Sequence, residues 1–462
     1  NASKLETNFI VVLNDNNMSI SENVGGVSKY LNNIRTADGY LDLKEGIYNK
    51  LTGSAKGNQV IKGIRRLKSS LKTLVIPGMF FEDMGITYLG PVDGHNVQAM
   101  IDVIHAAQRV EGPVLIHALT KKGKGYLPAE KHPARFHGTE PFDVVTGKLL
   151  NPKTEPSYTD VFSSVICSLA EHHENLVAIT AAMPDGTGLK RFRSQFPDRF
   201  YDVGIAEEHA VTFAAGLAAG GMKPVVAVYS SFLQRAYDQI IHDVCLQNLP
   251  VVFAIDRAGL VGSDGETHQG IFDLTYLSGI PNMHVLAPKN KWELADMLQF
   301  AVMFDGPIAI RYPRGTAYAG LEDHRAILEI GKAEWICREG EIALFALGSM
   351  VEEAEKVRDL LKAQGRKVSI VNARFAKPID TEALFDAAKD HSLIVTMEEN
   401  VAAGGYGEKI LAAANEKGLS NRILNITLPD SYVEHGCVSI LKKQLGMDPE
   451  TIADRIMEAW KA

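Results

Sequence analysis

Cysteine is scarce in this sequence, and its spacing excludes two classes of protein. The four cysteines lie far apart, and none forms a CxxC or CxxH pair with a neighbour. Zinc-binding modules and disulfide frameworks depend on such clustering. The pattern is typical of a reducing compartment, and we therefore expect a cytoplasmic protein.

Long hydrophobic runs and net positive charge are also lacking. No apolar stretch reaches the roughly 20 residues that span a bilayer. No signal peptide is visible, although the chain starts at Asn1 rather than at a methionine, so an upstream targeting segment stays open. The formal net charge is −8 at pH 7. An acidic chain is a poor ligand for nucleic acids and anionic membranes, and we expect neither partner.

What is present is an ordinary globular composition with alternating strand and helix patterns. Hydrophobic residues make up 46% and charged residues 23% of the 462 positions, and a chain of this length holds roughly three domains. The alternation predicts α/β architecture, with three doubly wound domains and mainly parallel sheets. A proline-rich stretch at 126–156 indicates a linker. We therefore expect domains at 1–125, 157–325 and 326–462.

Apolar runs and amphipathic repeats predict the individual elements. In the first domain we expect a buried strand at 9–13, an amphipathic helix at 62–72, a helix at 96–109 and a strand at 114–119. Later strands are expected at 176–179, 224–229, 251–255, 308–312, 342–346, 368–371 and 393–396. Two further helices are expected at 352–363 and 449–460.

An asparagine-rich turn follows the first predicted strand. The side-chain oxygen of Asn16 and a backbone carbonyl at Met18 suit a hard cation such as Mg²⁺. The turn falls at the carboxyl end of the strand, where open α/β sheets bind ligands. An ordinary strand-to-helix turn explains the same residues, and the turn alone does not decide between the two.

Glu207 stands where a strand-like run turns into a helix rich in alanine and glycine. A carboxylate at a helix start is often only a capping group. The small residues also allow close backbone packing, and a carboxyl group held in a water-poor interface has a raised pKa and can share a proton with a ligand nitrogen. Both interpretations stay open at this point.

The segment Ile205-Ala206-Glu207 resembles the cofactor-activating segment of thiamine-diphosphate enzymes of the transketolase superfamily. The resemblance implies that Glu207 hydrogen-bonds the aminopyrimidine ring of the cofactor and promotes its activation. Asn16 and Met18 then match the second segment of a Mg²⁺-diphosphate site. A transketolase-like fold follows, with the C-terminal part of a diphosphate-binding domain at 1–125, a pyrimidine-binding domain at 157–325 and a transketolase C-terminal-like domain at 326–462.

Three longer segments narrow the resemblance. Residues 229–239, 256–270 and 311–315 closely resemble the 1-deoxy-D-xylulose-5-phosphate synthase family, and the similarity covers essentially the whole chain. This resemblance implies a transferase that condenses pyruvate with D-glyceraldehyde 3-phosphate, giving 1-deoxy-D-xylulose 5-phosphate and CO₂. That reaction begins the non-mevalonate isoprenoid pathway and supplies thiamine and pyridoxal precursors. The alternatives are a transketolase, a 2-oxoacid dehydrogenase component, or an inactive phosphosugar-binding fragment.

The resemblance assigns the phosphate of the aldehyde to three residues. Tyr229, Arg257 and Arg314 match the family's positions for this group. A guanidinium fork suits a phosphate better than an ammonium does, and Tyr229 adds a hydroxyl donor. Either arginine alone would more often form a surface ion pair. Both follow predicted strands within matched motifs, which favours phosphate binding.

Four more residues of the middle domain receive roles by resemblance. Asp264 and His268 match groups that handle pyruvate-derived intermediates and proton transfers, and Arg235 matches one that holds the intermediate before decarboxylation. Phe232 matches a ring that packs against the aminopyrimidine. Without the resemblance, His268 would more often be a solvated loop residue and Phe232 an ordinary core residue.

Residues near the end of the first domain complete the expected site. By resemblance, Lys122 approaches the cofactor diphosphate, Tyr126 borders the cofactor, and His137 faces the reacting carbon. The lysines around Lys122 equally fit a solvated loop. We interpret Asp93 as a structural or capping residue.

Relative to this family, roughly the first 160 residues are absent. The metal-binding aspartate, phosphate-contacting glycines and active-site histidines expected there are missing with them. The ligands that remain in this chain are too few for an octahedral Mg²⁺ site. We therefore expect a longer biological protein, and the resemblance implies a homodimer.

Overall fold

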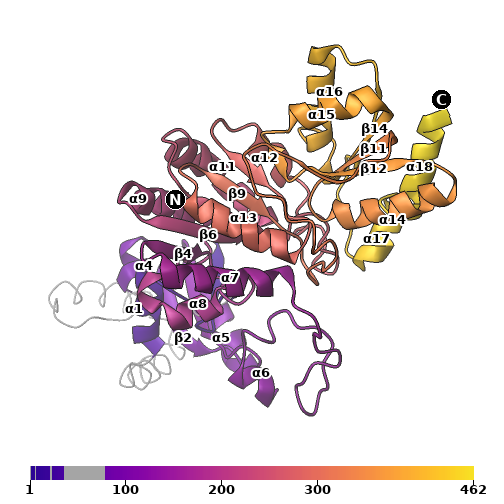
Figure 1. Cartoon of the computed structure of the whole chain (residues 1–462). Helices are drawn as coiled ribbons and strands as arrows, with labels where there is room; N and C mark the ends of the chain where they lie inside the picture. Colours follow the sequence, from indigo (N-terminus) through magenta and orange to yellow (C-terminus); the bar gives the residue numbers. More distant parts are fainter. Residues whose placement is uncertain (1, 6, 21–22, 36–78, 462) are drawn as a thin grey trace, which may run out of the picture. The chain divides into compact units, whose positions relative to one another are not determined.

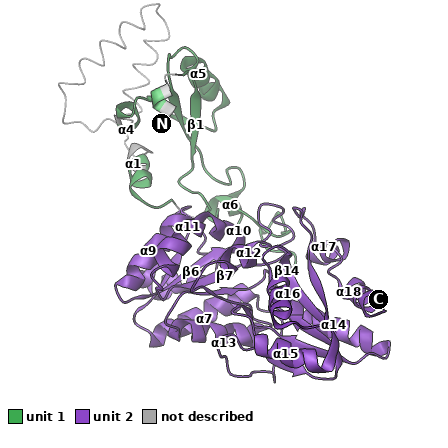
Figure 2. Cartoon of the chain, turned by 90° about the horizontal axis from the view of Figure 1, so that it is seen from above, with its two compact units in different colours: residues 1–152 green, residues 153–462 purple. Residues whose placement is uncertain are grey.

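The computed structural model describes residues 2–5, 7–20, 23–35 and 79–461 (Figure 1). The chain divides into two compact units, unit 1 at Asn1–Pro152 and unit 2 at Lys153–Ala462 (Figure 2). The described part of the chain contains three sheets, one in unit 1 and two in unit 2. Their strands are mainly parallel and alternate with helices, which confirms the predicted α/β fold class.

Unit 1 is built on a parallel sheet with the strand order β1-β3-β2. Its strands are β1 (Ile10–Asp15), β2 (Thr87–Asp93) and β3 (Val114–Leu119). The described helices are η1 (Ala2–Leu5), α1 (Gly26–Arg35), α4 (Met79–Asp83), α5 (Val97–Ala107) and α6 (Leu127–Lys131). Asn96 caps α5 by accepting a hydrogen bond from the N–H of Ala99, and Val103 of this helix joins Ile116 of β3 in a small core.

The first strand is parallel, as predicted, but the prediction that it is buried was wrong. Ile10, Val11 and Val12 are 39%, 42% and 49% exposed. Among the described strands, β1 pairs only with β3, so it is an outer strand of this sheet. An apolar run shows that a strand has apolar side chains, whereas its place in the sheet decides how well they are covered.

The first sheet of unit 2 has seven strands in the order β13-β8-β9-β7-β6-β4-β5. The parallel strands are β4 (Leu176–Thr180), β5 (Phe200–Asp202), β6 (Lys223–Tyr229), β7 (Val252–Asp256), β8 (His284–Leu286) and β9 (Ile308–Arg311). β13 (Phe375–Lys377) pairs antiparallel with β8. A strand from the last third of the chain thus completes a sheet formed by the middle third.

The helices that accompany this sheet include both long and short ones. They are α7 (Tyr158–His172), α8 (Lys190–Gln195), η3 (Pro197–Arg199), α9 (Glu207–Ala219), α10 (Ser230–Leu233), η4 (Gln234–Ala236), α11 (Tyr237–Gln239), the π-helix η5 (Ile240–Cys245), α12 (Asp273–Ser278) and α13 (Lys291–Met303). Ser157 and Asp160 form a reciprocal capping box at the start of α7, so two backbone N–H groups are satisfied by side chains.

The second sheet of unit 2 has the order β10-β12-β11-β14-β15. Its strands are β10 (Glu334–Cys337), β11 (Glu341–Ala346), β12 (Val368–Asn372), β14 (His391–Val401) and β15 (Arg422–Leu428), of which β10 is antiparallel. Its helices are α14 (Met350–Ala363), α15 (Thr381–Asp390), α16 (Tyr406–Lys417), α17 (Val438–Gln444) and α18 (Pro449–Lys461).

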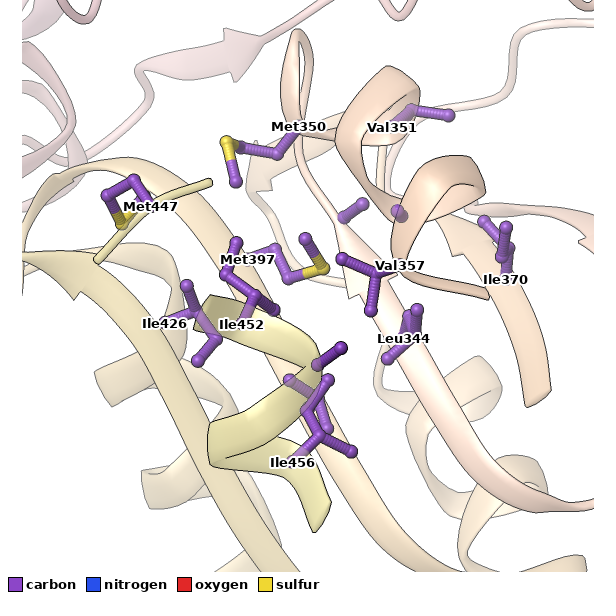
Figure 3. Close-up of a cluster of buried hydrophobic side chains, with 14 of the residues drawn as sticks. Leu344, Met350, Val351, Val357, Ile370, Met397, Ile426, Met447, Ile452 and Ile456 are labelled. Atoms are coloured by element: carbon purple, nitrogen blue, oxygen red, sulfur yellow. The ribbon is translucent and has the colours of Figure 1, made fainter. Parts of the chain in front are cut away.

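Buried apolar side chains join this second sheet to the helices on one of its faces. Figure 3 shows Leu344 and Met397 of the sheet facing Val357 of α14 and Ile452 of α18. Leu344, Val357, Met397 and Ile452 are fully buried. Full burial of one such side chain stabilises a fold by about 1.5–3 kcal/mol, so this cluster is a main source of stability for the C-terminal part.

Most predicted elements of unit 2 are confirmed to within one or two residues at their ends, and in unit 1 the strand at 114–119 and the helix at 96–109 are confirmed as well. The predicted helix at 62–72 lies outside the described residues. The short or antiparallel strands β5, β8, β10 and β13, and the longer β2 and β15, were missed. The stretch at 126–156 contains α6 and a bridge between Phe142 and Leu149.

Within the described ranges, none of the helices combines the length and the apolar character that a bilayer span requires.

Candidate active site

Three neighbouring strands of the seven-stranded sheet bring the predicted phosphate-binding residues together. Tyr229 ends β6 and is in register with Asp256 at the end of β7, and Ile255 of β7 is in register with Arg311 at the end of β9. Parallel strands present their carboxyl ends at one edge of a sheet, where α/β proteins bind ligands. Arg257 follows β7 directly and Arg314 comes shortly after β9, so both residues lie at the same edge as Tyr229.

Tyr229 and Arg257 are in direct contact. The guanidinium carbon of Arg257 lies 3.8 Å from the centroid of the Tyr229 ring, and Nη1 of Arg257 donates to the carbonyl oxygen of Gly186 at 2.9 Å. Burial raises the pKa of Tyr229 to about 12, so its hydroxyl stays a proton donor at neutral pH. Arg257 has a φ of +62°, a conformation held by the strand end and the turn that follows.

Several buried polar atoms at this edge have no protein partner. Within the described part of the chain, no hydrogen bond reaches Nε of Arg257, Oγ of Ser230 or Oγ of Ser231. Buried polar atoms are normally paired, because leaving one unpaired costs about 1–3 kcal/mol. Unpaired donors beside an arginine are what a site for a phosphorylated ligand requires.

Glu207 lies at the first position of α9 and is 2% exposed. Ala206 is the N-cap residue and has no hydrogen-bonding side chain, and Glu207 at the next position pairs with Arg235. Nη1 of Arg235 lies 3.3 Å from both carboxylate oxygens, which is longer than a strong charge-assisted hydrogen bond. The carboxylate therefore keeps acceptor capacity for a better-placed donor from a ligand.

An aromatic ring connects Glu207's partner to the other site residues. The Phe232 ring stacks on Tyr229 with centroids 5.6 Å apart and meets the His268 ring edge-on at 5.1 Å. The guanidinium of Arg235 lies 5.5 Å from the Phe232 centroid. Phe232 is partly exposed, unlike an ordinary core phenylalanine, and its position leaves it available to a flat ligand.

Asp264 and His268 lie on the loop that follows β7. Asp264 forms an ion pair with Arg314, with Oδ2 and Nη1 2.7 Å apart, and the same Nη1 donates to Oγ of Ser263 at 3.0 Å. Nδ1 of His268 is 2.8 Å from the hydroxyl of Thr267. The structure therefore brings Glu207, Tyr229, Phe232, Arg235, Arg257, Asp264, His268 and Arg314 into one connected group in unit 2.

The remaining predicted site residues belong to unit 1. Oδ1 of Asn16 accepts a hydrogen bond from the N–H of Met18 at 3.0 Å, which closes a tight turn directly after β1. Nζ of Lys122 donates to the carbonyl oxygen of Ser19 at 2.7 Å and thereby ties the loop after β3 to this turn. Burial lowers the pKa of Lys122. The predicted metal turn and the predicted diphosphate lysine are thus neighbours.

His137 and Tyr126 occupy the folded segment after β3. The pKa of His137 is lowered, first by burial and then by the positive charge of Lys122, which places the two side chains in one neighbourhood. The hydroxyl of Tyr126 donates to the carbonyl of Val144 at 2.9 Å, and its ring packs edge-on against Phe136. Tyr126 thus has a structural role in this segment. Asp93 accepts from the N–H of His95, which confirms a structural role, while Asn96 caps the helix.

Among the residues that the structure describes, no three His, Cys, Asp or Glu side chains come together in a way that could hold a metal ion. The oxygen atoms that fit Mg²⁺ are instead those of the Asn16–Met18 turn, and they provide only part of a six-oxygen set. The two residues fit a Mg²⁺ site that takes its other ligands from elsewhere, such as a diphosphate.

Three family models together match most of the chain. One described as "1-deoxy-D-xylulose-5-phosphate synthase" matches residues 1–120, one described as "Transketolase, pyrimidine binding domain" matches 154–318, and one described as "Transketolase, C-terminal domain" matches 331–452. A 1-deoxy-D-xylulose-5-phosphate synthase of Lachnoclostridium phytofermentans is 58% identical over 460 residues, which is 99% of this chain and 73% of that protein. The chain belongs to the 1-deoxy-D-xylulose-5-phosphate synthase family. Its predicted family is thereby confirmed.

A second relative supports the same conclusion. The 1-deoxy-D-xylulose-5-phosphate synthase of Caldanaerobacter subterraneus subsp. tengcongensis is 49% identical over 462 residues, covering 100% of this chain and 74% of that protein. The chain therefore spans about three-quarters of the length of these relatives. The 1-deoxy-D-xylulose-5-phosphate synthase family consists of thiamine-diphosphate-dependent transferases, so the predicted enzyme class is confirmed at this level.

Solved structures give the fold independently. A structure described as "Split gene transketolase, inactive beta4 tetramer" matches with a TM-score of 0.59 and 25% identity, covering 66% of this chain and 99% of that one. The transketolase of Campylobacter jejuni matches with a TM-score of 0.55 at 16% identity, covering 99% of this chain and 74% of that one. The second likeness shows the fold alone. The predicted transketolase-like architecture of this synthase-family chain is confirmed.

Sequence reasoning missed three residues that shape the site of this synthase-family chain. Gly186 accepts a hydrogen bond from Arg257 and leaves room for the Tyr229 hydroxyl, Ser263 contacts Arg314, and Gln269 is a buried residue of the loop that carries His268. The glycine-rich run 185–188 after a predicted strand was a signal for the first. Ser263 and Gln269 lie within the matched segment 256–270, but no local pattern marked them, because Arg314 and residues 433–434 are distant in sequence.

Proposed function

We propose that this protein is a 1-deoxy-D-xylulose-5-phosphate synthase that condenses pyruvate with D-glyceraldehyde 3-phosphate and releases CO₂. The observation that supports this proposal most is the joint presence of a buried carboxylate and an arginine-lined phosphate site at one sheet edge. Glu207 provides the first, and Tyr229, Arg257 and Arg314 provide the second. In such an enzyme thiamine diphosphate supplies the carbon at which pyruvate loses CO₂.

Residues of this chain fit both ends of thiamine diphosphate. Glu207, buried and with acceptor capacity left, would accept a hydrogen bond from the pyrimidine ring, and Phe232 would pack against that ring. Asn16 and Met18 would provide oxygen ligands to Mg²⁺, and Lys122 would approach the diphosphate. Tyr126 would border the cofactor from its segment, which its hydrogen bond to Val144 holds in place.

The substrate phosphate would be held by charge and by hydroxyl donors. Nε of Arg257 has no hydrogen-bond partner among the residues that the structure describes, and Tyr229 keeps its proton because burial raises its pKa. Arg314 now pairs with Asp264, so an incoming phosphate would share or replace that contact. This exchange would couple aldehyde binding to the position of Asp264.

The reacting groups of the substrates would meet residues gathered around the ring of Phe232. His268 contacts Phe232 directly, and Arg235 lies over the same ring while it pairs with Glu207. We assign His268 and Asp264 to proton handling and Arg235 to holding the carboxylate of pyruvate before it is lost. His137, whose pKa is lowered by burial and by Lys122, is a neutral imidazole at pH 7 and would face the reacting carbon as a proton acceptor.

The proposed reaction also suggests a role for the protein in metabolism. We propose that the protein acts in the cytoplasm as a homodimer, that its product enters isoprenoid synthesis, and that it also supplies thiamine and pyridoxal precursors. The domains would be a diphosphate-binding part at 1–125, a linker at 126–156, a pyrimidine-binding domain at 157–325 and a C-terminal domain at 326–462. Family-model matches at 1–120, 154–318 and 331–452 support this division.

The test is product analysis with the protein expressed from its complete gene. Pyruvate, D-glyceraldehyde 3-phosphate, thiamine diphosphate and Mg²⁺ should together give 1-deoxy-D-xylulose 5-phosphate and one CO₂ per product. Transfer of a ketol unit between sugar phosphates would indicate a transketolase, and acyl transfer to lipoamide would indicate a 2-oxoacid dehydrogenase component. No turnover in any of these assays would support a phosphosugar-binding protein and contradict the proposal.

A further inference from the structure

The loop that carries Asp264 and His268 is closed at its base and wound into successive turns. Gly259 and Gly270 exchange two backbone hydrogen bonds at 2.7 and 2.8 Å, which brings the two ends of the loop together. Between them, the N–H of Gly265 donates to the carbonyl of Gly262, and the N–H of His268 donates to that of Gly265. The two functional side chains are therefore held on one compact loop.

One side chain crosses this loop from the inside. Gln269 is 3% exposed and follows His268 directly. Its Oε1 accepts a hydrogen bond from the N–H of Val261 at 2.8 Å. Its Nε2 donates to the backbone carbonyls of Glu434 at 3.1 Å and Val433 at 3.4 Å. Both ends of the amide are used, one within the loop and one on the segment between β15 and α17.

The same segment contacts the loop at other points. The N–H of Gly436 donates to the carbonyl of Gly262 at 3.3 Å, and a Cβ on Gly262 would come within 2.7 Å of the Gly436 oxygen. Leu260 and Ile271, which flank the loop, are buried in the hydrophobic core of the five-stranded sheet together with Val433. The loop follows a strand of the seven-stranded sheet but is anchored to the core of the other sheet.

We propose that Gln269 is a positioning residue, through which segment 433–436 of the C-terminal part sets the place of Asp264 and His268. This inference rests on the proposed function, because it concerns the substrates of that same site. An amide side chain is suited to this role. Its oxygen accepts from the N–H of Val261 in the loop, and its nitrogen donates to the backbone carbonyls of Val433 and Glu434 in the segment between β15 and α17. Functional loops gain precision when buried contacts to a rigid core hold them.

Loss of the Gln269 contacts should affect binding of the aldehyde substrate first. Asp264 pairs with Arg314, so a displaced loop takes away the partner that orients one of the two phosphate-binding arginines. It also moves His268 away from Phe232. The carboxylate of Glu207 lies on α9, outside the loop, and keeps its place. Loss of the Gln269 contacts should thus impair use of the aldehyde more than activation of the cofactor.

The test replaces Gln269 by methionine, which has a similar size and no hydrogen-bonding amide. Gln269→Glu is the second variant, because it keeps an acceptor for Val261 but cannot donate to the carbonyls of Val433 and Glu434. Two controls are matched to them. Gln247→Met removes an exposed glutamine that bonds to the carbonyl of Asp243, and Glu434→Ala removes a side chain while leaving the backbone carbonyl in place.

The first readout is amide hydrogen exchange of the peptide that contains Val261. It reports the hydrogen bonds of Gln269 and does not depend on enzyme activity. We expect at least tenfold faster exchange in Gln269→Met, a smaller increase in Gln269→Glu because its carboxylate still accepts from Val261, and unchanged exchange in both controls. The second readout is steady-state kinetics, where KM for D-glyceraldehyde 3-phosphate should rise about tenfold to a hundredfold, while aldehyde-independent pyruvate decarboxylation, which also uses residues of the loop, should fall by a clearly smaller factor.

The outcomes separate this proposal from the proposed function. Unchanged exchange in both Gln269 variants, or an equal fall of every kinetic parameter, would overturn the positioning role. A large effect of Glu434→Ala would also overturn the positioning role, because it would show that the side chain of Glu434, and not its backbone carbonyl, holds the loop. If the wild-type protein makes no 1-deoxy-D-xylulose 5-phosphate while exchange responds as expected, the proposed function fails, but Gln269 still holds the loop against segment 433–436.

Discussion

Close packing around single residues controls the geometry of the proposed phosphate site. Gly186 lies against Tyr229 so closely that a Cβ at this position would overlap the hydroxyl oxygen. Its carbonyl oxygen also accepts the hydrogen bond from Nη1 of Arg257. A residue without a side chain is therefore required for the close contact with Tyr229.

We predict that Gly186→Ala displaces the Tyr229 ring and raises KM for D-glyceraldehyde 3-phosphate about tenfold. Overpacking of this kind costs about 1–3 kcal/mol of unfolding free energy. Gly279→Ala is the matched control, because no atom lies within 4 Å of a Cβ there. Steady-state kinetics and urea unfolding measure the two effects. Equal KM values in the two variants would show that the Tyr229 hydroxyl does not contact the aldehyde.

Glu207 and Arg314 should divide their roles cleanly. Glu207→Ala removes the buried carboxylate and should abolish turnover of pyruvate with or without the aldehyde, because cofactor activation is lost. Arg314→Ala should leave aldehyde-independent decarboxylation within about threefold and reduce kcat/KM for the aldehyde about a hundredfold, as expected for a lost charged hydrogen bond to phosphate. Measurements of CO₂ release under both conditions distinguish the variants. An equal loss of pyruvate-only decarboxylation in both would refute this division.

At the scale of elements, helix α16 begins beside a buried carboxylate. Glu398 accepts hydrogen bonds from the N–H groups of Tyr406 and Gly407, both at 2.8 Å. Burial nevertheless raises its pKa to about 7. Between its ordinary pKa and about pH 7, the folded state thus holds a proton that the unfolded state has released. Stability is therefore present at low pH and falls as the pH rises through this window.

We predict that the unfolding free energy of the wild type, relative to Glu398→Gln, falls by about 2–3 kcal/mol between pH 5 and pH 8. The variant carries no titrating group at this position, so the difference isolates Glu398. Urea unfolding at several pH values measures it. A constant difference over this range would contradict the raised pKa.

Strand β1 shows how far an element can be predicted. The apolar run predicts a strand, and the Asn-rich residues after it predict a turn, because both are local properties of the backbone and side chains. Exposure of Ile10 and Val12 depends on the neighbours of the strand, which no local pattern contains. The short strand β13 was missed for the same reason, since its partner β8 lies about ninety residues away.

At the scale of the whole unit 2, a buried ion cluster joins its two sheets. Lys289 and Glu293 come from the part that forms the seven-stranded sheet, and Glu334 and Arg374 come from the part after it. Nε of Arg374 lies 2.8 Å from Glu293, and Nζ of Lys289 lies 2.7 Å from Glu334. All four side chains are at most 6% exposed, so each charge depends on its partners.

We predict that Arg374→Met lowers the unfolding free energy of unit 2 by about 3–5 kcal/mol, because it leaves an uncompensated buried negative charge. Lys332→Met is the control, since the pair of Lys332 with Glu382 is exposed and its attraction is screened by solvent. Thermal unfolding of both variants in the full protein gives the comparison. Similar losses in the two would show that burial does not strengthen the cluster.

The sequence by itself determined the α/β class, most strands and helices of unit 2, and the residue types that the site needs. The class and the elements follow from local periodicity, and the residue types follow from motif segments that are recognised by the order of their residues. Only the tertiary structure decided which groups meet. Arg257 stacks on Tyr229, Arg235 reaches Glu207, and Gln269 ties the substrate loop to another layer, because hydrogen bonds and ring contacts join residues that folding alone brings together.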